Sequence, residues 1–167
     1  MKLFSANIED LQGLYIVNLK RALDMEEKIT RSLPDLVDRA TDSELTAAFR
    51  THLEETRGHV LKIKGLLRQL VGEISTETCK AIVGLTTEAS DTITDVKDPS
   101  VRDMALIGVA QQVEHHEIAV YGTLRRWAKL LGLDQDAAIL ESIEAEEMNT
   151  DEILTDISER VNLVAAA

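Results

Sequence analysis

The side chains of this sequence that could do chemistry are carboxylates and histidines, which recur at helical spacing on faces that should be apolar. The clearest run is residues 113–121. There Glu114 and Glu117 lie one helical turn apart, and Glu117 falls on the apolar stripe of the helix. A carboxylate facing a core is costly unless a partner compensates its charge, and stacked carboxylates repel unless a cation lies between them. The run therefore predicts either a metal site or a helix edge that faces water.

Three other segments repeat this pattern of charged residues on or beside an apolar stripe. Their candidate ligands are Glu26, His52, Glu55, His59, Glu144 and Glu147. A two-metal carboxylate site in a four-helix bundle takes a Glu from each of two helices and a two-ligand motif from each of the others. Hard oxygen donors with one or two imidazoles suit iron or manganese better than zinc or copper. We therefore predict two ions of iron or manganese, bound by these residues together with Glu114 and Glu117.

The spacing leaves two assignments open. In the second segment either His52 or His59 supplies the imidazole, since both lie along the shoulder of the buried side. In the last segment the candidate carboxylates are Glu144, Glu146, Glu147 and Asp151. The competing interpretation of all these residues is a wet, charged gap in the core or a polar dimer face.

Four long amphipathic helices would position these side chains, and the composition favours them. The chain has 167 residues, of which 44% are hydrophobic and only 3% aromatic, so we expect one domain with an aliphatic core. Two Pro and eight Gly leave little turn chemistry, which favours long helices. The predicted helices span about Met1 to Ala40 (with a ragged start near Gly13), Ser43 to Val71, Pro99 to Leu131 and Ala137 to Val161.

The helix ends and connections have recognisable residues. Asp42 or Ser43 can cap the second helix and Asp98 the third, and Asp134-Gln135-Asp136 is predicted to cap the fourth. The segment from Gly72 to Pro99 is a long connection with its own short helix, long enough to cross the length of a bundle. The predicted domain is 1–162, followed by a frayed tail at 163–167.

Charge and composition exclude several function classes. A formal net charge of −12 argues against a nucleic-acid partner, because phosphates would be repelled. No uncharged run approaches the roughly 20 residues of a membrane helix, and no signal peptide is recognised. A single cysteine cannot form an internal disulfide, which favours a reducing compartment. No phosphate-binding loop or Ser/His/Asp arrangement occurs, and no catalytic residue is assigned.

The sequence resembles the YciE/YciF stress-protein family of the ferritin-like superfamily over nearly its whole length. The segments that carry the resemblance are 24–26 with 32–34, 48–56, 79–85, 101–107 and, most specifically, Val113-Glu114-His115-His116-Glu117-Ile118-Ala119-Val120-Tyr121-Gly122. The resemblance implies an all-α, ferritin-like four-helix bundle with one long crossover, a two-metal centre and a bacterial cytoplasmic setting. This chain departs from the family pattern at Leu23, where the family often has Tyr, and at Glu55, which is followed by His four rather than three residues later.

Two functions follow as expectations. The first is a di-iron or di-manganese redox protein that oxidises ferrous iron or removes oxygen or peroxide, with Glu55 and Glu147 bridging the ions. The second is a non-catalytic structural or stress protein that associates through a helix face. We expect a homodimer in the cytoplasm, with metal ions as its partners.

Overall fold

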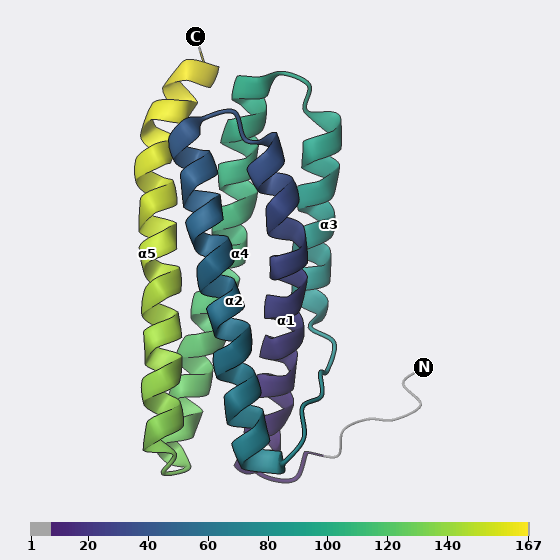
Figure 1. The fold of residues 1–167 in the computed structure, drawn as a ribbon, viewed down its shortest axis with the longest axis vertical. Coiled ribbons are helices and arrows are strands. Elements are labelled where there is room, and N and C mark those ends of the chain that lie inside the picture. Colours follow the sequence, from purple (N-terminus) through teal and green to yellow (C-terminus); the bar gives the residue numbers. More distant parts are fainter. Residues whose placement is uncertain (1–7, 167) are drawn as a thin grey trace.

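The computed structural model describes residues 8–166, and within that range the secondary structure is entirely helical (Figure 1). The helices are α1 (Leu11–Arg39), α2 (Ser43–Val71), α3 (Lys80–Asp95), α4 (Pro99–Leu130) and α5 (Asp134–Ala165). The predicted four-helix bundle with a short extra helix in its crossover is therefore confirmed. Across 8–166, none of these helices combines the length and the apolar character needed to cross a bilayer.

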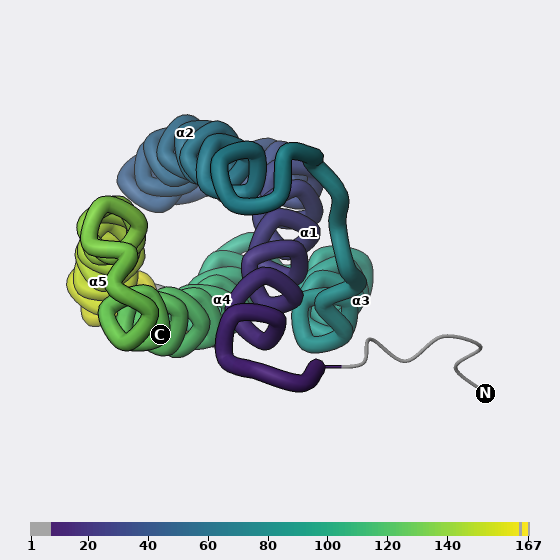
Figure 2. Tube along the Cα trace, turned by 90° about the horizontal axis from the view of Figure 1, so that it is seen from below, coloured from purple at the N-terminus to yellow at the C-terminus, as the bar shows by residue number. Residues whose placement is uncertain are grey.

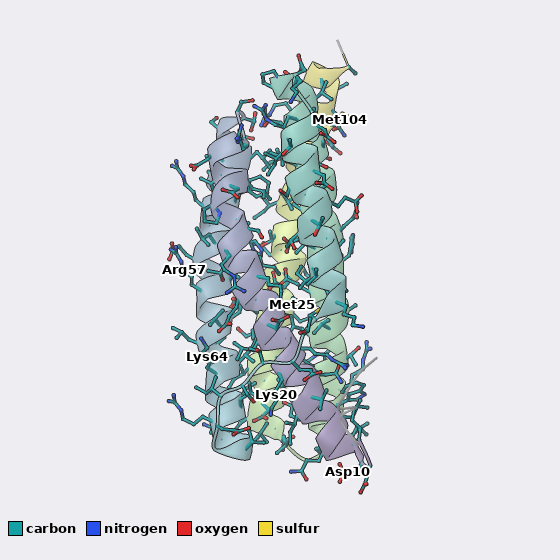
Figure 3. All side chains as sticks on the ribbon, turned by 90° about the vertical axis from the view of Figure 1, so that its right-hand side faces the viewer. Asp10, Lys20, Met25, Arg57, Lys64 and Met104 are labelled. Carbon is teal, nitrogen blue, oxygen red and sulfur yellow. The ribbon has the colours of Figure 1, made fainter. Side chains whose placement is uncertain are left out.

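The four long helices form a ring in the order α1, α2, α5, α4, with each helix packed on the next (Figure 2). Neighbours in the ring run antiparallel, and α3 packs outside the ring against α1 and α4. The crossover through α3 lets α4 start at the end of the bundle where α2 also starts (Figure 1). Asp10 and Met104 mark the two opposite ends of the bundle in Figure 3.

Helix ends follow the local sequence. The side chain of Asp42 accepts hydrogen bonds from the Glu44 and Leu45 backbone N–H groups, both at 3.0 Å, and so caps α2 as predicted. Asp98 caps α4 in the same way, with Pro99 in the first turn. Gly72 ends α2 in the left-handed conformation with a φ of 75°, which a residue with a Cβ adopts only at a cost.

The first helix begins at Leu11, close to the ragged start expected near Gly13, because the Asp10 side chain accepts from the Gly13 N–H at 2.7 Å and caps it there. Residues 1–7 of the predicted helix lie outside the described residues. The last helix begins at Asp134, earlier than the predicted Ala137, so the residues predicted to cap it form its first turn. Negative side chains there interact favourably with the helix dipole. Asp136 accepts a hydrogen bond from the Tyr15 hydroxyl at 3.1 Å instead of capping.

The last helix also ends later than predicted. It continues through 163–165, which we assigned to a frayed tail beyond a domain of residues 1–162. No Gly or Pro follows Val161, and the closing alanines are strong helix formers, so no local signal stops the helix earlier.

Two buried or half-buried carboxylates fix the connections. Asp103 of α4 is 3% exposed and accepts from the Thr41 N–H (2.9 Å), the Thr41 hydroxyl (2.6 Å) and the Asp42 N–H (2.8 Å), which holds the turn between α1 and α2. Asp24 of α1 accepts from the Cys79 N–H at 2.8 Å and holds the crossover where α3 begins. These contacts hold the α1–α2 turn against α4 and the start of α3 against α1.

Candidate metal centre

Six ionisable side chains meet in the interior of the bundle, and each of the four ring helices contributes at least one of them. They are Glu26 of α1, His52 and His59 of α2, Glu114 and Glu117 of α4, and Glu147 of α5. None is more than 2% exposed. Charged residues are almost never buried to this degree unless something pairs with them, so the interior needs a compensating partner.

The six residues form two groups that share Glu147. One group is His52, Glu114, Glu117 and Glu147, and the other is Glu26, His59 and Glu147. Within each group, one possible ligand atom per residue lies within 4.8 Å of all the others, close enough for one metal ion to contact them all. Two adjacent groups of possible ligands with a shared carboxylate are the arrangement that a bridged two-metal centre would require.

Most of the ligand atoms in these groups have no hydrogen-bond partner. Among residues 8–166, the atoms left without one include both oxygens of Glu117 and Glu147, Oε2 of Glu26 and Glu114, both ring nitrogens of His52 and Nδ1 of His59. Leaving a buried polar group unpaired costs roughly 1–3 kcal/mol each, and more for charged groups. A cation among these atoms would satisfy several of them at once. Carboxylate oxygens with imidazole nitrogens are donors that suit iron or manganese, so the residues fit a two-metal centre.

Both candidate histidines lie in the interior, one in each group. Nδ1 of His59 is 3.0 Å from Glu147 Oε1 and 3.7 Å from Glu26 Oε1. Nε2 of His52 is 3.3 Å from Glu114 Oε1, while its Nδ1 is 3.8 Å from Glu147 Oε2. The sequence left open which of His52 and His59 supplies an imidazole, and the structure places one of them in each group of possible ligands.

The far side of His59 is held by a second set of residues. Its Nε2 lies 2.6 Å from Glu146 Oε2, and this carboxylate also accepts from Lys62 Nζ at 3.0 Å and from the Ser142 hydroxyl at 3.0 Å. Burial opposes ionisation of Glu146, but hydrogen bonds from His59, Lys62 and Ser142 outweigh it and lower its pKa. The ionised carboxylate therefore accepts from the Nε2–H of His59, and Nδ1 is left to face the centre. Histidine ligands of metals are commonly oriented in this way.

Tyr121 closes the centre on the side of Glu26. Its hydroxyl donates to Glu26 Oε1, and its ring packs edge-on to the His59 ring with centroids 6.3 Å apart. Burial first, and then the nearby carboxylates of Glu26, Glu117 and Glu147, raise the pKa of Tyr121 well above its usual value. Tyr121 therefore stays a neutral donor that fixes one oxygen of Glu26 and leaves the other free.

Burial and crowding shift the pKa values of the interior residues. Burial, followed by the charges of neighbouring carboxylates including Glu147 and Glu26, raises the pKa of Glu114 and of Glu117 well above 4.5. Burial alone would lower the pKa of His59, but its contacts with Glu147 and Glu26 raise it to about 10. Burial lowers the pKa of His52 despite the attraction of Glu147. Without metal, the centre thus favours bound protons.

Two of the predicted ligands lie outside both groups. The Glu55 side chain is 30% exposed and its Oε2 is 4.0 Å from His52 Nδ1. The side chain of Glu144 turns to Arg125, whose Nε donates to it at 2.6 Å, and Oε1 of Glu144 occupies the space beside Gly122 where a Cβ would lie 2.7 Å away. Neither placement supports a direct role in binding, because neither side chain belongs to a group of possible ligands.

Glu54 faces away from the centre, and Asp151, one of the candidate carboxylates of the last segment, lies outside both groups. Glu54 is 70% exposed and pairs with Arg57, which lies at the outer edge of the bundle in Figure 3. Asp151 is 20% exposed and approaches His115 at 3.6 Å, outside both groups. The role of Glu146 beside His59 was missed, since this contact joins α2 to α5 and leaves no trace in the spacing of either helix.

A family model described as a domain of unknown function, DUF892, matches residues 10–167 of the chain. The Escherichia coli (strain K12) protein YciF is 37% identical over 153 residues, which make up 91% of this chain and 92% of the relative. The crystal structure of the E. coli stress protein YciF matches with a TM-score of 0.88 at 35% identity, covering 92% of this chain and 98% of that chain.

Two further solved structures resemble this one. The Rhodopseudomonas palustris protein described as "YcfI, a putative structural protein" has a TM-score of 0.88 at 35% identity, over 92% of this chain and 98% of that one. A protein from Xanthomonas campestris pv. campestris has a TM-score of 0.76 at 22% identity, over 94% and 96% of the two chains, and this likeness concerns the fold alone. The chain therefore belongs to the DUF892 family, which confirms the resemblance to the YciE/YciF proteins.

Proposed function

We propose that this protein binds two iron or manganese ions in the interior of its bundle and uses them in redox chemistry with dioxygen or peroxide. His52, Glu114 and Glu117 would hold one ion, Glu26 and His59 the other, and Glu147 would bridge them. The observation that carries the proposal is Glu147, which belongs to both groups and has both oxygens buried without a hydrogen-bond partner among the described residues.

The surrounding residues would prepare the ligands for this task. When bound, two such ions supply the electron transfer and charge stabilisation that redox chemistry with dioxygen or peroxide needs. Glu146 orients the His59 ring, and Tyr121 fixes one oxygen of Glu26. The aliphatic residues around the centre exclude bulk water, which strengthens every electrostatic contact inside it. No residue of the chain is assigned a proton-transfer or nucleophilic role.

Metal analysis of protein purified without added metal tests the proposal. We expect iron or manganese at close to two ions per chain, and Glu147→Gln should lose more than one ion's worth because both groups contain this residue. Wild-type protein that takes up neither metal, even after incubation with ferrous or manganous ions, would contradict it.

A second candidate is a structural role without chemistry, in which the polar interior is only a charged gap. The description of the R. palustris relative favours it, and that protein shares 35% of its sequence with this one. The two candidates differ in metal content, since a structural bundle would not need to bind metal. Because the E. coli relative is described as a stress protein, we propose that either function serves a stress response. We also propose that the protein acts in the bacterial cytoplasm as a homodimer.

A further inference from the structure

A partly enclosed pocket lies next to the metal centre, on the side covered by the crossover helix α3. Helices α1, α2, α3 and α4 all contribute to its wall, and most of the lining is apolar, including Leu33, Phe49, Ala89 and Val113. Two polar residues of the lining, His52 and Glu114, belong to one group of candidate metal ligands. The pocket therefore borders one of the two groups of candidate ligands.

The size and lining of the pocket restrict what it can hold. Its cavity volume is about 30 Å³, while a single water needs roughly 10–15 Å³ by a similar measure. A diatomic molecule fits in this space and a larger organic substrate does not. Most of the wall is apolar, and its polar residues are His52, Glu114, Ser32 and Thr86, so an ion would lose hydration over most of its surface, whereas a small uncharged molecule would lose almost nothing.

The crossover helix forms the wall through a small residue. Ala89 is one of two residues of α3 that are buried, at 6% exposed, and it faces the pocket. A larger side chain at this position would occupy the cavity. His52 and Glu114 carry buried atoms without hydrogen-bond partners at the other end, so a molecule in the pocket would meet unsatisfied ligand atoms and not a closed surface.

We propose that this pocket binds a small uncharged molecule of the size of dioxygen and delivers it to the His52–Glu114 side of the centre. The use of the delivered molecule rests on the proposed function, but its binding does not. The pocket can therefore be tested on metal-free protein, where failure of the proposed metal chemistry would not affect the result.

Methyl-group NMR under dioxygen pressure is the first test, because dissolved dioxygen is paramagnetic and speeds the relaxation of the protons it visits. On metal-free protein we expect the largest enhancement at the methyl groups of Leu33 and Val113. The methyl groups of Leu67 and Leu140, which are fully buried and do not line the pocket, should respond much less. Equal enhancement at all four residues would overturn the proposal.

Matched variants of α3 give the second test. Ala89→Leu should fill the cavity and remove the excess relaxation at Val113, while Ala81→Leu, at an exposed position of the same helix, should leave it unchanged. If Ala89→Leu does not fold, Ala89→Val should reduce the excess in part. In iron-loaded protein, Ala89→Leu should slow oxidation by dioxygen several-fold with unchanged ferrous affinity. Enhancement that persists at Val113 in a folded Ala89→Leu variant would contradict the assignment.

Discussion

Glu146 shows how a residue outside the two ligand groups can control one inside. It holds Nε2 of His59 at 2.6 Å and is itself held by Lys62 and Ser142. We expect Glu146→Gln to weaken metal binding by about 10- to 100-fold, because residues that orient a histidine ligand have effects of that size. Metal affinity from chelator competition measures the change.

Glu144→Gln is the matched control, since it alters a carboxylate of the same helix that pairs with Arg125 and lies outside both groups. A loss of affinity in Glu144→Gln equal to that in Glu146→Gln would mean that general disturbance of α5 is the cause. Retained affinity in Glu146→Asp together with a loss in Glu146→Gln would support the role of the charge.

Glu117 and Glu54 test whether the direction of a side chain decides metal binding. Glu117 is fully buried with two unpaired oxygens, whereas Glu54 is 70% exposed and pairs with Arg57. Glu117→Ala should therefore lower metal occupancy strongly and Glu54→Ala should barely change it. Elemental analysis of both variants after identical purification measures the metal content. Equal metal content in the two variants would show that the burial of a carboxylate does not determine whether it binds metal.

Among the connections between helices, the turn between α1 and α2 depends most on one residue. Asp103→Ala would remove the charged acceptor of the partly buried hydrogen bonds from the Thr41 and Asp42 N–H groups, and hydrogen bonds to charged groups contribute roughly 1.5–3 kcal/mol each. We expect the variant to lose about 2–4 kcal/mol of unfolding free energy, measured by urea denaturation. The exposed Asp156→Ala on α5 is the control and should change stability by less than about 0.5 kcal/mol. A loss of stability in Asp103→Ala as small as in this control would contradict the role of Asp103 in holding the turn between α1 and α2.

The helices could be predicted from the sequence because their signals are local. Apolar residues at helical spacing, together with Asp42, Asp98 and Gly72, place α2 and α4 within a residue or so. The predicted start of α5 is too late because Asp134 and Asp136 lie in its first turn. Asp136 accepts a hydrogen bond from Tyr15, which is 121 residues away in the sequence. Local patterns cannot show such partners.

The same distinction holds for the centre. Glu26, Glu117 and Glu147 could be named because each stands on the apolar stripe of its own helix, and Glu114 because it lies one turn before Glu117 on the shoulder of that stripe; all four are buried. Glu55 and Glu144 lie on shoulders, where a neighbouring helix decides whether a side chain turns inward or outward. Pairs such as His59 with Glu146, or Asp103 with Thr41, form only when the bundle assembles.

The molecule as a whole should respond to pH and metal together. The raised pKa values of Glu114 and Glu117 mean that the folded metal-free protein binds more protons than the unfolded chain, whose carboxylates titrate near 4.5. Their contribution to stability is therefore lost as pH rises above that value. His59 acts in the same direction between 6.5 and about 10. His52 has a lowered pKa, so below pH 6.5 its contribution to stability increases as pH rises. The contributions of Glu114, Glu117 and His59 decrease as pH rises, and we expect these three to outweigh that of His52.

Metal would replace the lost protons as the compensating charge and stabilise the folded state by mass action. We therefore expect ferrous or manganous ions to raise the melting temperature more at pH 7.5 than at pH 5.5. Calorimetry of chelator-treated protein, with and without metal at both pH values, measures this difference. No shift at either pH would favour the structural role, and a larger shift at pH 5.5 would show that the sign of the proton linkage is wrong.

The four ring helices surround two groups of candidate ligands, and anomalous scattering from crystals tests directly whether these groups bind metal. Crystals of metal-loaded protein should show two anomalous peaks at the iron or manganese edge, about 3.5–4 Å apart. We expect Glu147 to contact both peaks, with His59 on one and His52 on the other. Loaded crystals without an anomalous peak among these residues, or with a single peak that Glu147 does not contact, would contradict the two-metal account.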